Sequence, residues 1–503
     1  MAVNPSIQLG TSGNWAIKED NLLAYKQLGN KFFDREFDFS RGTRATFVGR
    51  NGLIQESGLT SAELVTNGDF ATDSDWTKGT GWTISGGTAN QDGSNGIIRQ
   101  SNVAPLNTKF KVTFDLTNYN GNGGLTIKLA PTQYDVTLNG NGTYNIFTDG
   151  TNTLNDSLQI ISSNGFVGSI TNVSVKEIQV DVPRIDFTDD PTGHLLLEPQ
   201  STNLFTYSND FSQWGSLSGA SVINNVLVSP DGTLNADEFV FDGTSNGRIE
   251  KSVPTTNGLD YTFSIYLKNK DIANPTQVFI GTSGGGGEFV TITNGWQRFT
   301  TTQIADDTSE YPRVRYNGVG SLYAYGAQFE QQSYATSYIP TSGSAVTRNQ
   351  ELCNNSGTVN DFNSEEGVLY TETACIADLA NNRAISVSSD NSNYASIQYN
   401  PTSNRILGRY RNAGSFMSQI SFDVADRTQF SKIAFRYKQD DFALFVNGVK
   451  VATKTSGNVL PADTFTSLNF STSSSENPFQ GKAKCVAVFK EALTDEELQT
   501  LTT

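Results

Sequence analysis

The feature that most constrains this chain is a period-two alternation of apolar and polar residues, which recurs along most of its 503 residues. The clearest examples are the segments 109–119, 124–130, 260–268, 276–281 and 298–304. Turn signals such as Asn-Gly and Pro-Asp-Gly separate them at spacings of roughly eight to twelve residues. Because successive side chains of a strand point to opposite faces, this pattern predicts half-buried β-strands. Their number and spacing predict an all-β fold of tandem β-sandwich jelly rolls with little helix.

Helical signals are confined to two places. Residues 492–501 carry a leucine-rich face, and Thr494 with Glu497 three residues later forms a capping-box pattern. We also expect a short helix within residues 19–33. Neither segment alters the all-β prediction.

An internal repeat sets the organisation of the first two thirds of the chain. Residues 37–76 resemble residues 185–214: each copy runs from an Asp-Phe strand through a glycine turn to an Asp-Phe motif (67–70 and 208–211) and a tryptophan. About 100 to 115 residues of alternating strands follow each copy, which predicts two homologous modules. We therefore expect an N-terminal arm (1–60), module 1 (61–180), a linker (181–203), module 2 (204–345) and a C-terminal domain (351–503).

The charge distribution limits the classes of partner. The net charge is −16, and residues 61–350 hold 15 Lys/Arg against 28 Asp/Glu. Such a surface repels phosphate, so no nucleic-acid partner is expected, although acidity also simply keeps a large surface soluble. The apolar runs are too short for membrane insertion, and residues 1–10 lack the pattern of a secretory signal, so we expect synthesis in the host cytoplasm without export.

Metal and nucleophile chemistry finds little support in the sequence. A single histidine, His194, excludes a zinc site built from several histidines. The three cysteines, Cys353, Cys375 and Cys485, lack the spacing of metal ligands and are expected to be buried thiols.

Three resemblances to known families follow from particular segments. The C-terminal domain resembles laminin G-like, concanavalin A-like jelly rolls in its Asn-Gly hairpin (441–453), its F-x-G-x-A strand (479–483) and its closing strand and helix (486–501). The module openings at 67–70 and 208–211 resemble those of carbohydrate-binding modules. The segments LLLEPQSTNLFTYSNDFSQW (195–214) and SYIPT (337–341) resemble segments that recur in bacteriophage tail-fibre and head-fibre proteins.

These resemblances imply a non-enzymatic bacteriophage virion protein, exposed on the particle, that binds host cell-surface glycans during adsorption. Residues 1–60 would contact other virion proteins, and a homo-oligomer, dimer or trimer, is expected. One alternative is a purely structural decoration or adaptor protein of the capsid or tail. Another is a polysaccharide-degrading enzyme with accessory binding modules. That enzyme would need paired carboxylates facing one cleft, and residues 351–503 show no such alternation on a strand.

A glycan site needs aromatic side chains beside polar ones. Tyr311, Arg313, Arg315 and Tyr316 provide this combination within EYPRVRYNG and are our predicted glycan-binding residues. A second cluster, Arg405, Arg409 and Arg411, would contact an anionic glycan or a neighbouring subunit, or form a solvated strand face.

Calcium is the one cofactor that the resemblance suggests, since both sandwich families often hold a structural Ca²⁺. Asp69 and Asp210 occupy matching positions in the two repeats and are the predicted ligands. The alternative is that both carboxylates cap turns by accepting nearby N–H groups.

Overall fold

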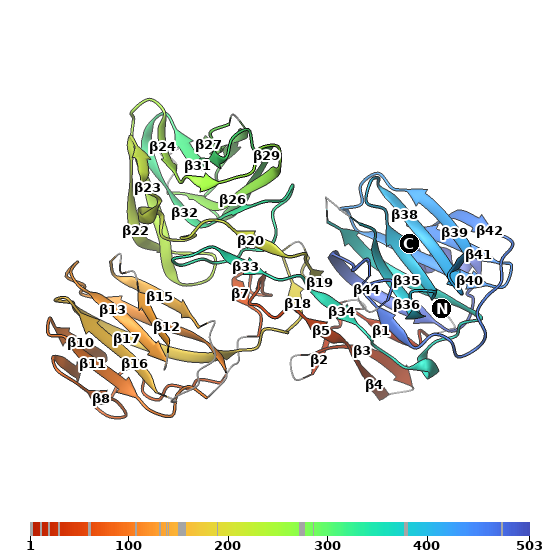
Figure 1. Ribbon diagram of the computed structural model, residues 1–503, viewed down its shortest axis with the longest axis horizontal. Helices are drawn as coiled ribbons and strands as arrows, with labels where there is room; N and C mark the ends of the chain where they lie inside the picture. Colours follow the sequence, from red (N-terminus) through yellow and green to blue (C-terminus); the bar gives the residue numbers. More distant parts are fainter. Residues whose placement is uncertain are drawn as a thin grey trace.

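Three β-sandwich lobes meet at a central junction of short strands in the computed structural model (Figure 1). Module 1 is the orange lobe, module 2 the green lobe and the C-terminal domain the blue lobe, in which both chain ends lie. No helix in the described part of the chain is long and apolar enough to span a membrane. The structure describes residues 4–10, 13–18, 21–28, 31–58, 62–105, 108–129, 132–136, 138, 140–148, 157–188, 190–270, 277–284, 286–376, 381–473 and 476–503.

Module 1 contains two five-stranded antiparallel sheets. Its strands are β8 (Thr77–Lys78), β9 (Trp82–Ser85), β10 (Thr88–Asp92), β11 (Gly96–Gln100), β12 (Lys109–Thr117), β13 (Gly124–Leu129), β14 (Thr132–Val136), β15 (Gly142–Phe147), β16 (Leu158–Ser163) and β17 (Val167–Ile178). The sheet orders are β15-β12-β17-β10-β9 and β14-β13-β16-β11-β8. The alternation predicted for β12 is confirmed, because Phe110, Val112 and Phe114 are fully buried between the sheets.

Module 2 repeats this architecture. Its strands are β21 (Ser216–Ser218), β22 (Ala220–Val228), β23 (Leu234–Asp242), β24 (Gly247–Glu250), β25 (Val253–Pro254), β26 (Asp260–Asn269), β27 (Gln277–Gly281), β28 (Gly287–Thr291), β29 (Gln297–Ile304), β30 (Ser309–Glu310), β31 (Arg313–Tyr316) and β32 (Val319–Glu330). The two main sheets have the orders β21-β24-β31-β27-β28 and β22-β23-β32-β26-β29, and β25 pairs with β30.

The repeated Asp-Phe motif has a packing role in both modules. The Phe70 and Trp76 rings lie 5.2 Å apart, and the Phe211 and Trp214 rings, on the 3₁₀ turn Phe211–Trp214, lie 4.9 Å apart. The Trp76 indole N–H donates to the Asn67 carbonyl, and the Trp214 indole N–H donates to the Tyr207 carbonyl, at 3.0 Å in both cases. The repeat therefore places a buried aromatic pair in each sandwich core.

The C-terminal domain is the largest sandwich. Its elements are the 3₁₀ turn Val359–Asp361, β35 (Glu366–Cys375), β36 (Arg383–Asp390), β37 (Asn393–Tyr399), β38 (Arg405–Asn412), β39 (Ser415–Asp423), β40 (Ser431–Lys438), β41 (Phe442–Val446), β42 (Val449–Lys454), β43 (Ser467–Asn469), β44 (Gly481–Phe489) and α1 (Asp495–Thr502). The predicted Asn-Gly hairpin is confirmed between β41 and β42, with positive φ at Asn447 and Gly448. The predicted capping box is confirmed too: Glu497 N–H donates to Thr494 Oγ1 at the start of α1.

The N-terminal segment and the linkers are built into the C-terminal domain and the junction. Their strands are β1 (Ile7–Leu9), β2 (Ala16–Lys18), β3 (Asn21–Leu28), β4 (Lys31–Glu36), β5 (Asp38–Ser40), β6 (Thr46–Val48), β7 (Ile54–Glu56), β18 (Arg184–Asp186), β19 (His194–Leu197), β20 (Ser201–Asn203), β33 (Val346–Arg348) and β34 (Leu352–Asn354). One face of the C-terminal domain has the order β2-β3-β1-β44-β35-β40-β41-β42, with β4 on β3 and the β18–β19 hairpin on β44. The opposite sheet has the order β39-β38-β37-β36-β43.

Part of residues 1–60, the expected N-terminal arm, joins a sheet of the C-terminal domain. Ile7 and Leu9 are buried in the core of the C-terminal domain, which explains why β1 pairs with β44. The prediction of a helix within 19–33 is wrong for the described residues, which form β3 and β4. Strand pairing with β1, and burial of Leu22 and Leu23, outweigh the local preference there.

The central junction is held by five buried charged residues: Arg41, Arg184, Glu198, Arg348 and Glu351. Arg41 and Arg184 both donate to Glu351, at 2.8 and 2.9 Å, and Arg184 and Arg348 bind Glu198 at 2.9 and 2.8 Å. This network therefore joins the N-terminal segment (Arg41), the linker (Arg184 and Glu198) and the stretch that leads from module 2 into the C-terminal domain (Arg348 and Glu351).

Candidate functional site

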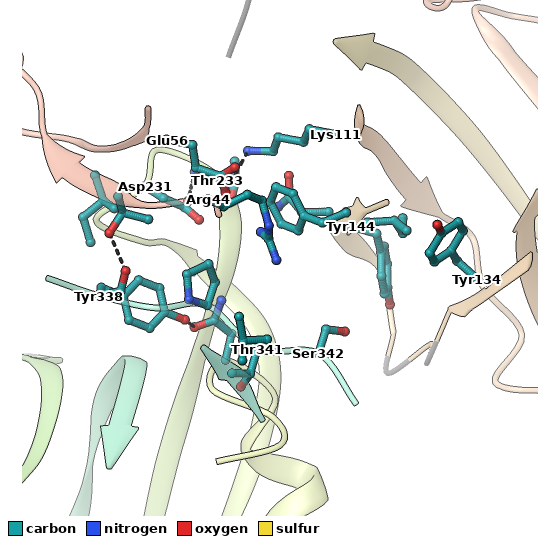
Figure 2. Close-up of a pocket in the computed structure, with 18 of the residues that line it drawn as sticks. Arg44, Glu56, Lys111, Tyr134, Tyr144, Asp231, Thr233, Tyr338, Thr341 and Ser342 are labelled. Atoms are coloured by element: carbon teal, nitrogen blue, oxygen red, sulfur yellow. Dashed lines mark hydrogen bonds and ion pairs between the residues drawn. The ribbon is translucent and has the colours of Figure 1, made fainter. Parts of the chain in front are cut away.

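A cleft with a volume of about 630 Å³ lies where module 1, module 2 and the β6–β7 hairpin meet. We call it the central cleft. Figure 2 shows Tyr134 and Tyr144 on the module 1 side, Tyr338 and Thr341 on the module 2 side, and Arg44 between them. Clefts of several hundred Å³ that lie between domains are typical places for small ligands.

The module 1 wall of the cleft combines aromatic rings with cations. Tyr134 is half-buried on the edge strand β14, and the guanidinium of Arg44 lies 3.6 Å from the Phe147 ring centroid on β15. The ammonium of Lys111 lies 5.4 Å from the same ring and 3.8 Å from Glu56 Oε1. This wall therefore offers ring faces and hydrogen-bond donors side by side.

The module 2 wall is polar and rigidly connected. The hydroxyl of Tyr325 donates to Asp231 Oδ2 at 2.9 Å, and that of Tyr338 donates to Asn209 Oδ1 at 2.6 Å. Burial, followed by the effect of Asp231, raises the pKa of Tyr325, and burial raises that of Tyr338, so both hydroxyls remain protonated donors at neutral pH.

Three polar atoms of the cleft lining are buried without a hydrogen-bond partner: Arg44 Nη1, Glu56 Oε2 and Thr341 Oγ1. Leaving such a group unsatisfied costs on the order of 1–3 kcal/mol. A bound molecule with several hydroxyl groups, reaching them after small side-chain rotations, would recover part of that energy.

The predicted residues Tyr311, Arg313, Arg315 and Tyr316 lie elsewhere, on or next to β31 of module 2. Arg313 and Arg315 flank the buried Val314 and so share the outer face of the sheet. Arg313 pairs with Glu250 at 3.4 Å, whereas the Arg315 guanidinium lies 4.4 Å from the Phe279 ring.

A second, smaller hollow of about 290 Å³ adjoins these residues and is lined by Gln277, Phe289, Arg315, Tyr316 and Asn317. Tyr316 also packs against Phe241 at 5.8 Å, and Tyr311 is half-exposed before the strand and does not line the hollow. The structure thus brings Arg315 and Tyr316 together, with Arg313 beside them, and the glycan role of all four residues stays a prediction.

The predicted calcium ligands have short-range partners. Asp69 Oδ1 accepts from Ala71 N–H at 3.3 Å, as in the turn-capping alternative. Asp210 Oδ1 instead accepts from the Ser212 hydroxyl at 2.6 Å, and its side chain makes no cap hydrogen bond to the 3₁₀ turn that follows. The described residues contain no group of three or more His, Cys, Asp or Glu side chains that could hold a metal ion. Asp210 Oδ2 is nevertheless buried without a partner, and burial, together with Asp210, raises the pKa of Asp237 to about 8.

The sequence reasoning missed the central cleft. Arg44, Lys111 and Tyr134 are far apart in the chain and were not predicted as site residues. The one available signal was the aromatic character of Tyr134, which is shared by many core residues. The three cysteines are buried free thiols, as predicted.

The family comparison concerns the C-terminal domain. Residues 374–499 match the family model described as the concanavalin A-like lectin/glucanases superfamily. The predicted laminin G-like, concanavalin A-like domain is therefore confirmed for this part of the chain. No curated protein sequence matches the chain.

Among solved structures, similar chains include binding modules of glycan-active enzymes. The CBM40 of the Ruminococcus gnavus IT-sialidase, bound to α2,3-sialyllactose, is 18% identical with a TM-score of 0.24, over 28% of this chain and 84% of its own. Domain 4 of an arabinanase from Geobacillus stearothermophilus, in complex with arabinotriose, is 12% identical with a TM-score of 0.26, over 34% and 84%. The tandem CBM22 domain of a Paenibacillus barcinonensis protein is 11% identical with a TM-score of 0.20, over 54% and 98%. TM-scores this low give no information about which ligand this chain binds.

Proposed function

We propose that this protein binds glycans and that the central cleft holds the sugar. The observation that carries the proposal is the composition of the cleft wall: Tyr134 beside the Arg44–Phe147 pair, with Lys111 at its rim. Sugars present apolar C–H faces and hydroxyl edges, which match aromatic rings and adjacent donors. The volume of about 630 Å³ is in the range of small-ligand sites.

We further propose that the protein is a non-enzymatic component of a bacteriophage virion, of the tail- or head-fibre type, that adsorbs to host-surface glycans. The phage-like segments at 195–214 and 337–341 support this assignment. Docking to other virion proteins would involve residues 1–60, whose strands β2 to β4 extend one edge of the C-terminal sheet. Several copies per particle would raise a weak single-site affinity through multivalency.

The test is binding of the purified full chain to an array of bacterial surface glycans and to candidate host cells, with and without EDTA. We expect saturable binding, which Tyr134→Ala weakens about tenfold, because it removes one aromatic contact and one hydrogen-bonding hydroxyl. Because Tyr134 also packs against the module 1 core, its substitution should lower the melting temperature moderately, and a melting curve shows that the variant is folded at the assay temperature.

Tyr311→Ala is the matched control, because Tyr311 is also partly exposed and lies outside the cleft. If Tyr311→Ala, but not Tyr134→Ala, weakens binding, the sugar sits on the β31 face instead. Absence of binding to every glycan and cell would favour a decoration or adaptor protein. Release of oligosaccharide on long incubation would favour the enzyme alternative.

A further inference from the structure

A second feature of the molecule lies on the C-terminal domain, far along the chain from the central cleft. On the outer face of the β39-β38-β37-β36-β43 sheet, two guanidinium groups share one aromatic ring. Those of Arg409 and Arg411 lie 5.2 and 5.3 Å from the Phe416 ring centroid. Phe416 stands opposite Arg411 across the β38–β39 pair and is 44% exposed. The ring therefore holds two like charges close together at the surface.

No carboxylate in the described part of the chain forms an ion pair with either guanidinium. Arg409 Nη1 donates to the side-chain Oε1 of Gln398 at 2.6 Å, and its Nε is buried without a hydrogen-bond partner among the described residues. Arg411 donates to the backbone carbonyls of Gly414 and Asn391, at 2.9 and 2.7 Å. Burial lowers the pKa of Arg409, and the neighbouring Arg411 lowers it further.

Arg405, on the same strand, has a different environment. Its guanidinium forms a two-point pair with Asp423, at 2.7 and 3.0 Å. In a chain with a net charge of −16, carboxylates are plentiful, yet the Arg409–Arg411 pair has none. A fixed pair of guanidiniums without a counter-charge is the arrangement that binds carboxylate or sulfate oxygens.

The surroundings of this pair favour a saccharide as the bearer of the anion. On the adjacent strand, Gln398 donates to Ser396 Oγ at 2.9 Å, and both residues are buried, so they support Arg409 from below and do not face a ligand. On the other side, Gln419 stands opposite Arg409 and is exposed. An exposed amide such as that of Gln419 bonds sugar hydroxyls, whereas an extended polyphosphate would meet the acidic remainder of the protein.

We propose that this face is a second binding site, for a carboxylate- or sulfate-bearing saccharide. The guanidiniums of Arg409 and Arg411 bind the anionic group, Phe416 positions them, and the exposed Gln419 contacts neighbouring hydroxyls. This site is independent of the central cleft, so either proposal can fail without the other.

The experiment is calorimetric titration of the full chain at low ionic strength with trigalacturonic acid, its methyl ester, and a short DNA duplex. We expect saturable binding of the acid and at least tenfold weaker binding of the neutral ester. Arg409→Gln combined with Arg411→Gln should weaken acid binding at least tenfold, since it removes two charge-assisted contacts. Phe416→Leu should weaken it severalfold, because it removes the ring that orients both groups.

Arg405→Gln is the matched control, since it removes the same charge from the same strand but from an already paired residue. It should change acid binding less than twofold. The proposal is overturned by any of four results: no binding of the acid, equal binding of the ester, equal losses in Arg405→Gln and the double variant, or DNA binding as tight as that of the acid. Melting curves of each variant show whether a loss reflects unfolding.

Discussion

The central junction and the Arg409–Arg411 face use arginine in opposite ways. At the junction, Arg41, Arg184 and Arg348 are fully buried, and each contacts Glu198 or Glu351. On the outer face of the C-terminal domain, the two guanidiniums are partly exposed and have hydrogen bonds to neutral groups instead. Buried charges need oppositely charged partners within the protein, whereas a half-exposed charge is solvated by water and can bind a counter-charge from a ligand. The comparison separates arginines that hold the lobes together from arginines that are available for binding.

Arg184→Ala should produce the largest effect on stability. It would leave Glu198 and Glu351 buried with fewer cations, and breaking such a pair costs about 3–5 kcal/mol. Arg409→Ala should cost far less, because no buried carboxylate loses its partner. Denaturant unfolding of both variants checks the difference, and equal losses would remove the distinction between the two groups.

The junction should also make the protein labile to acid. Burial alone would raise the pKa of Glu198, but Arg348 and Arg184 outweigh it and lower the pKa to about 2, and arginines likewise lower that of Glu351. Because the folded pKa values lie below the ordinary value of 4.5, the stabilisation is present above pH 4.5 and is lost as the pH falls toward 2. Melting temperatures measured from pH 6 down to pH 2 should fall steeply, and a flat profile would contradict this account.

Asp237 is a buried carboxylate that forms no ion pair with a cation in the described part of the chain. Burial and Asp210 raise its pKa from 3.8 to about 8, so its contribution has the opposite sign. The folded state holds a proton that the unfolded state releases, and stability declines as the pH rises from about 4 to 8, by an amount on the order of a few kcal/mol.

Asp210→Asn should reduce this alkaline loss, because it removes the neighbouring negative charge. Asp69→Asn, at the matching position of module 1, is the control and should change the melting temperature little at pH 9. Equal melting temperatures of the two variants at pH 9 would argue against the role of Asp210.

The same melting measurement tests for calcium binding. A rise in the melting temperature at pH 9 on adding CaCl₂, absent in Asp210→Asn, would indicate a cation at Asp210.

The fold was largely predictable because its signals are local. Alternation over 109–119, the Asn-Gly turn after Val446 and the Thr494–Glu497 capping box each depend on residues a few positions apart. The error within 19–33 has the opposite cause. There the strand form depends on β1, which in turn pairs with β44, almost 480 residues away.

The candidate sites also depend on contacts between residues that are far apart in the chain, and local sequence patterns do not predict such contacts. The central cleft brings Arg44, Lys111 and Thr341 together from three segments, and no local pattern connects them. The Arg405–Arg409–Arg411 cluster was visible in the sequence as an alternation on one strand. The structure was needed to distinguish Arg405, which Asp423 neutralises, from the other two.

The smallest expected effect completes the comparison of paired and unpaired arginines. Arg405 and Asp423 are both about half exposed, at 46% and 59%, so their pairing contributes little against solvent and salt. Arg405→Gln should therefore leave the unfolding midpoint unchanged within error, at low and at high salt. Because Arg405 is paired but exposed, this result would show that burial, and not pairing alone, makes the junction arginines structural. A clear loss of stability would mean that this strand edge depends on its surface charges, and would weaken Arg405 as a control for ligand binding.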